Sequence, residues 1–83
     1  MGKQLDDRPP LQRAVDGAAG LKAGSWQSVE ALALLAIEAK GLPECASLRD
    51  AAHAAAAALK PATWESIRAL TCLARADREI DVG

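Results

Sequence analysis

Leu21–Ala36 reads LKAGSWQSVEALALLA, and Leu59–Ala74 reads LKPATWESIRALTCLA. At an offset of 38 residues, the second stretch keeps eight of the sixteen residues of the first. An internal repeat of this length, built of segments with helical spacing, is typical of stacked helical hairpins. Such arrays usually present a surface to another molecule, so the repeat predicts a binding role and not a catalytic one.

The composition is that of an ordinary globular domain. Of the 83 residues, 51% are hydrophobic and 25% are charged, and the net charge is -1. This charge gives nucleic acid no electrostatic attraction, and two tryptophans without Phe or Tyr provide no platform for stacking bases. We therefore expect one domain and no nucleic-acid partner.

The sequence also bears on the cellular compartment. The first ten residues, MGKQLDDRPP, hold two acids and a Pro pair where a secretory signal needs a basic start and an apolar run. No stretch is apolar for long enough to span a bilayer. We predict a cytoplasmic protein without a membrane partner. Cys45 and Cys72 are 27 residues apart and not in a C-x-x-C arrangement, so two reduced thiols are expected, with a disulfide or a metal pair as the alternative.

Apolar spacing and helix-breaking residues predict an all-α chain of four helices. Ser25 and Thr63 are expected to cap the second and fourth helices, and Gly41 to close the second. The predicted helices span Leu11–Ala19, Trp26–Lys40, Pro43 to about Lys60, and Trp64 to about Arg78.

Short connections between these helices predict two stacked antiparallel hairpins, as a short helical-repeat array or bundle. The single domain then covers residues 1–83, with a flexible lead-in at 1–9 and hairpins at about 10–40 and about 43–79. About three units are normally needed before such a stack is stable alone. With two units, the chain is expected to associate with itself or with a protein partner.

Positions that stay apolar in both copies of the repeat are the predicted core. Trp26 and Trp64 begin equivalent helices, and each is expected to pack across the top of its hairpin. The predicted core pairs are Val29/Ile67, Leu32/Leu70, Leu35/Leu73 and Ala36/Ala74.

Two sets of residues resemble the tetratricopeptide-like helical repeats, in which a Leu and a Pro end one hairpin and large, Leu and small positions follow in the next helix. The resemblance implies helical hairpins whose first helices line a concave groove that holds a peptide. The residues that carry it are Leu59, Pro61, Ile67, Leu70 and Ala74 in the second copy, and Val29, Leu32, Ala33 and Ala36 in the first.

Four pairs of positions change in size or charge between the copies and fall at i, i+3, i+7 and i+10, which is one stripe on each helix. The resemblance implies that this stripe lines the peptide groove, where it suits a segment with an apolar half and an acidic half. A solvated face or additional core is the alternative interpretation. The candidate partner-binding residues are Gln27/Glu65, Glu30/Arg68, Leu34/Cys72 and Ile37/Arg75.

The leading hypothesis is thus an adaptor or small chaperone-like module without enzymatic activity, cofactor or metal, because no catalytic or ligating constellation is present. One alternative is a phosphopantetheine carrier, since GSWQSVEALALLAIEAKGLP resembles the serine-to-helix segment of acyl and peptidyl carriers, with Ser25 as the attachment site. Another is a small helix-turn-helix regulator that reads DNA with Arg68, Arg75 and Arg78. His53 is expected to be solvated.

Overall fold

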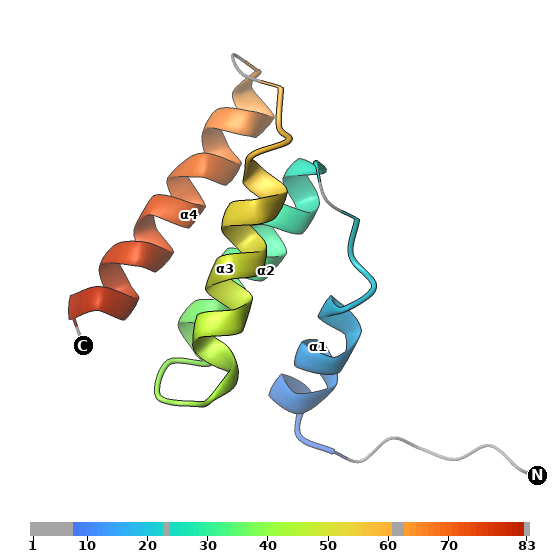
Figure 1. The fold of residues 1–83 in the computed structure, drawn as a ribbon, viewed down its shortest axis with the longest axis vertical. Helices are drawn as coiled ribbons and strands as arrows, with labels where there is room; N and C mark the ends of the chain where they lie inside the picture. Colours follow the sequence, from blue (N-terminus) through green and yellow to red (C-terminus); the bar gives the residue numbers. More distant parts are fainter. Residues whose placement is uncertain (1–7, 23, 61–62, 83) are drawn as a thin grey trace, which may run out of the picture.

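A computed structural model of the chain describes residues 8–22, 24–60 and 63–82 (Figure 1). These residues form four α-helices and no strand, which confirms the all-α prediction. Compared with the predicted bounds, α2 ends two residues and α3 four residues earlier, whereas α4 continues four residues further. The helices are α1 (Pro10–Ala18), α2 (Trp26–Glu38), α3 (Glu44–Ala56) and α4 (Trp64–Val82).

Local sequence explains where α2 and α4 begin. The backbone N–H of Ser28 donates to Oγ of Ser25 at 3.3 Å, and that of Ser66 donates to Oγ1 of Thr63 at 3.1 Å. Each hydroxyl satisfies a backbone donor that has no partner within the helix. Both predicted caps are confirmed. After α2, Gly41 adopts a φ of +89°, so that the chain can turn towards α3.

Helix α2 is the centre of the fold. It packs extensively against both α3 and α4, whereas the contacts of α1 with α2 and of α3 with α4 are sparse. Helices α2 and α4 run in the same direction, and α3 runs opposite to both (Figure 1). Contacts across the α2–α4 seam join Glu30 to Arg68 and Lys40 to Glu79, so equivalent residues of the two copies lie level with one another.

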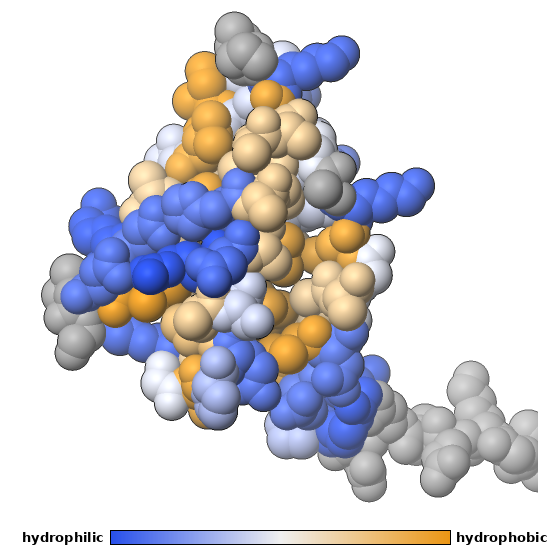
Figure 2. All heavy atoms as spheres, in the orientation of Figure 1, coloured by the Kyte–Doolittle hydropathy of each residue, from blue (hydrophilic) through white to orange (hydrophobic). Residues whose placement is uncertain are grey.

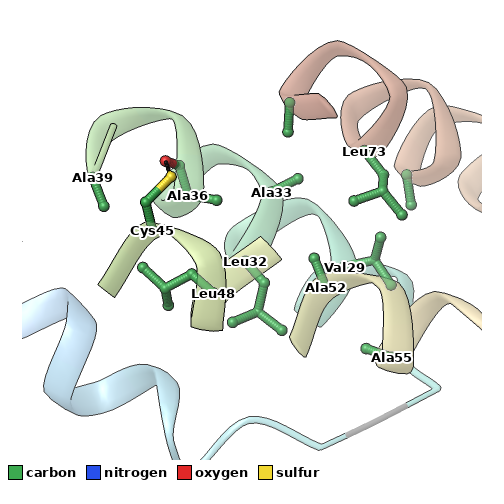
Figure 3. Close-up of a cluster of buried hydrophobic side chains, with 12 residues drawn as sticks. Val29, Leu32, Ala33, Ala36, Ala39, Cys45, Leu48, Ala52, Ala55 and Leu73 are labelled. Atoms are coloured by element: carbon green, nitrogen blue, oxygen red, sulfur yellow. Dashed lines mark hydrogen bonds between the residues drawn. The ribbon is translucent and has the colours of Figure 1, made fainter. Parts of the chain in front are cut away.

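The hydrophobic core comes from α2, α3, α4 and the turn after α2, and α1 contributes no buried residue (Figure 3). Alanine dominates it, and Val29 is the only large side chain among the described residues that is fully buried. The thiol of Cys45 donates to the backbone oxygen of Ala36 at 3.4 Å, which ties the start of α3 to α2. None of the helices in the described ranges is both long and apolar enough to cross a membrane.

The predicted core of the second copy is wrong in part. Ile67 and Leu70 are 59% and 44% exposed, although their counterparts Val29 and Leu32 are 0% and 5% exposed. Ala74 is exposed as well, whereas its counterpart Ala36 is buried. The difference in exposure depends on whether another helix covers these residues. Helix α3 follows α2 and covers it, but no described helix follows α4. Trp64, predicted to pack on its hairpin, is accordingly 65% exposed.

This contrast predicts different costs for the same substitution at equivalent positions. Leu32→Ala should lower the free energy of unfolding by about 2–5 kcal/mol, because it removes buried methyl groups and leaves a cavity. Leu70→Ala should change it by about 0.5 kcal/mol or less, as at other exposed sites. Urea unfolding of both variants in dilute protein tests this. Equal losses would mean that Leu70 is covered in the monomer.

The glycine before α2 supports a second prediction. Gly24 has a φ of +84°, and a Cβ built there would lie 3.3 Å from the Cβ of Ala58. At Gly41, also at positive φ, a Cβ would meet no atom within 4 Å. Alanine at either position should cost about 1–2 kcal/mol from the left-handed backbone. Gly24→Ala should cost more than Gly41→Ala in urea unfolding because of the additional contact, and the reverse order would contradict this packing.

Candidate functional site

The structure divides the predicted stripe between exposed and partly buried residues. Ile37 and Cys72 pack against the core beside the α2–α4 seam, so the alternative interpretation as additional core applies to them. Glu30 and Glu65 are also partly buried. The residues of the stripe that are exposed are Gln27, Leu34, Arg68 and Arg75.

One ion pair joins the two halves of the stripe. Nε of Arg68 lies 3.4 Å from Oε1 of Glu30, and the Glu30 side chain is only 14% exposed. Its second oxygen, Oε2, is buried and accepts no hydrogen bond from the described part of the chain. The carboxylate is therefore incompletely satisfied, which is costly for a buried charge.

A basic hollow of about 430 Å³ is lined by residues of α4. It contains three of the arginines of α4, and no acidic residue lines it. Arg78 was outside the predicted stripe, but its position three residues after Arg75 places both on the same side of the helix. The hollow is lined by Arg68, Thr71, Cys72, Ala74, Arg75 and Arg78.

An apolar cleft of about 380 Å³ lies between α1 and α2. Leu34, the apolar member of the predicted stripe, lines it and is 47% exposed. The structure thus places Leu34 in a different hollow from Arg68 and Arg75. From the first helix and the turn after it, the cleft is lined by Ala14, Gly17, Ala18 and Leu21. From α2 it is lined by Ala31, Leu34, Leu35 and Glu38.

A polar cluster between α3 and α4 was missed by the sequence analysis. Nε2 of His53 lies 2.9 Å from Oδ2 of Asp77, and the His53 side chain is 52% exposed, so the residue is solvated as predicted but also contacts α4. Nη1 of Arg49 donates to Oδ1 of Asp81 at 2.5 Å, and its Nε lies 3.9 Å from Asp77. The hydrogen bond to Asp81 and the attraction of its charge raise the pKa of Arg49 above its ordinary value. The sequence holds one signal of this cluster: Arg49 and His53 are four residues apart, as are Asp77 and Asp81, so each pair lies on one side of its helix.

We expect this cluster to stabilise the α3–α4 contact, which is otherwise sparse. Asp77→Asn should lower the midpoint of thermal unfolding slightly, because it removes the charge that faces His53 and Arg49. The difference from wild type should shrink in 1 M NaCl, where such partly exposed pairs are screened. Glu38→Gln, at an exposed acid on α2 outside this cluster, is the matched control. An effect of Asp77→Asn that salt leaves unchanged would contradict an electrostatic role.

Ser25 and the two cysteines are the remaining candidate groups. The hydroxyl of Ser25 caps α2 and donates to Oε1 of Gln27 at 2.9 Å, which supports a structural role for the residue that the carrier hypothesis would modify. Cys45 and Cys72 are free thiols, as predicted. Among the described residues, no group of three or more His, Cys, Asp or Glu side chains could hold a metal ion.

Comparison with protein families, with curated proteins and with solved structures found no match for the chain. The resemblance to tetratricopeptide-like repeats therefore stays a prediction. Among the hollows that the described residues line, one is basic and lies on α4, and another is almost entirely apolar and lies between α1 and α2.

Proposed function

We propose that the protein is a non-catalytic interaction module that binds a partner segment carrying both acidic and apolar side chains. The observation that carries this proposal is the basic hollow of α4, where three arginines gather without an acidic residue among the lining side chains. Guanidinium groups bind carboxylates through paired hydrogen bonds, so the hollow favours an acidic partner.

The apolar part of the partner finds contacts on α2. Leu34 is exposed at the edge of an almost entirely apolar cleft, and burial of such surface is favourable in water. Helices α2 and α4 pack against each other and run parallel, so Leu34 and the arginines of α4 lie on adjacent helices. In this arrangement the acidic half lies over Arg68 and Arg75 and the apolar half over Leu34.

A pull-down from the native cell extract tests the proposal. Tagged wild-type chain and an Arg75→Glu/Arg78→Glu variant serve as baits, because these arginines are exposed in the hollow and Arg68 also pairs with Glu30. Retained proteins are identified by mass spectrometry. We expect a protein that the wild type retains and the variant loses by about tenfold or more, because each substitution replaces an attraction with a repulsion. Purified partner and bait are then titrated by calorimetry to confirm direct binding.

Lys22→Glu/Lys60→Glu is the matched control, since it makes the same charge change at exposed residues outside the basic hollow. All baits must show equal helical content by circular dichroism. Identical sets of retained proteins for all three baits would contradict the proposal. The same preparations distinguish the alternatives, because a carrier has a larger intact mass by its phosphopantetheine arm and a DNA-binding regulator shows salt-dependent binding to duplex DNA.

A further inference from the structure

The two ends of the helical array both leave an apolar surface open. At one end, α4 exposes Ile67, Leu70 and Ala74, and Figure 2 shows hydrophobic residues gathered along the upper part of this helix. At the other end, the cleft between α1 and α2 is open. Helices α1 and α4 lie on opposite sides of the α2–α3 pair (Figure 1).

The α1 side of the cleft corresponds to a part of the core. Adding the repeat offset of 38 residues to each lining residue before α2 gives a residue of α3 or of the turn after it. All four of these equivalents are buried or pack against the core. The equivalent pairs are Ala14/Ala52, Gly17/Ala55, Ala18/Ala56 and Leu21/Leu59.

The α2 side of the cleft also corresponds to a part of the core. Its four lining residues have equivalents on α4, and these too are buried or pack against the core. The equivalent pairs are Ala31/Ala69, Leu34/Cys72, Leu35/Leu73 and Glu38/Ala76. Within one molecule, α2 covers the surface that these residues of α3 and α4 form. The cleft is therefore an uncovered equivalent of the surface on which α2 packs.

Helix α4 is the segment of this chain whose sequence corresponds to α2. We propose that α4 of one molecule docks into the α1–α2 cleft of a second copy, head to tail. Ile67, Leu70 and Ala74 then occupy the places that Val29, Leu32 and Ala36 of α2 hold against α3 and α4. Each docking event leaves the cleft of the first molecule and the α4 surface of the second unoccupied, as in other heterologous interfaces.

Charges at the seam are complementary in this assembly. Within one molecule, Glu30 of α2 pairs with Arg68 at the equivalent position of α4. Docking by the same geometry sets Arg68 beside Glu30 of the second molecule, a side chain that is 14% exposed and also faces its own Arg68. Within one molecule, Lys40 also donates to the backbone oxygen of Glu79. In the interface, the residue of α4 that corresponds to Lys40 is Arg78, which is also basic.

The interface is weaker than the core that it resembles. Where α2 carries Ala33 and Ile37, α4 carries Thr71 and Arg75. Less apolar surface is buried, and polar groups must be partly desolvated. Association is therefore reversible and depends on protein concentration.

Sedimentation velocity of the purified full chain, over about two decades of concentration, tests the proposal. We expect the average mass to rise with concentration beyond that of a monomer. Ile67→Asp alters only the α4 surface and Leu34→Asp only the cleft, and both residues are largely exposed, so each variant should fold. Each should lower the association constant by about tenfold or more, because docking would bury an unpaired carboxylate.

An equimolar mixture of the two variants is the decisive measurement. Each variant keeps one intact surface, so the mixture should form a one-to-one dimer and stop there. Ala54→Asp places the same charge on the outer side of α3 and should associate like wild type. All variants are checked for unchanged thermal unfolding in dilute solution.

A wild-type mass that stays monomeric at every concentration would overturn the proposal. So would association that Leu34→Asp leaves intact, since a symmetric contact between two α4 helices does not use the cleft. The measurement contains no partner protein, so its outcome does not depend on whether an acidic segment binds, although the two kinds of binding would compete for Leu34.

Discussion

The close approach of α2 to α3 and α4 is the constraint on which the rest of the structure depends. Alanines such as Ala33, Ala36 and Ala69 lie fully buried where the helices meet, and their short side chains let the backbones come near. Each such contact buries little apolar area, so a chain of this size is only marginally stable. The level alignment of α2 with α4, and with it the position of every surface residue on them, follows from this packing.

Features that depend on local sequence were predictable. The caps at Ser25 and Thr63 need only residues within one turn, and the four helices follow from apolar spacing and breakers. The burial of Ile67 and Leu70 was predicted wrongly, because a repeated residue has the same chemistry in both copies but not the same neighbours. Whether a side chain is covered depends on the next helix, and that information is not in the repeated residues themselves.

The candidate surfaces also combine features that local sequence predicts with features that depend on packing. The spacing of the variable positions predicted that they share one side of each helix, but the packing of α2 against α4 turns Ile37 and Cys72 towards the core. The cleft escaped prediction because half of it belongs to the weak helix α1. The cluster of Arg49 and His53 with Asp77 depends on how far α3 and α4 are shifted along each other, which only the folded structure fixes.

The two thiols give the protein a built-in pair of chemical reporters. Cys45 is buried and donates to the backbone oxygen of Ala36, so a thiol reagent reaches it only when α3 separates from α2. Cys72 is partly exposed on α4 and serves as an internal reference in the same molecule. The ratio of their labelling rates thus measures how often the α2–α3 hairpin opens, without any probe added to the chain.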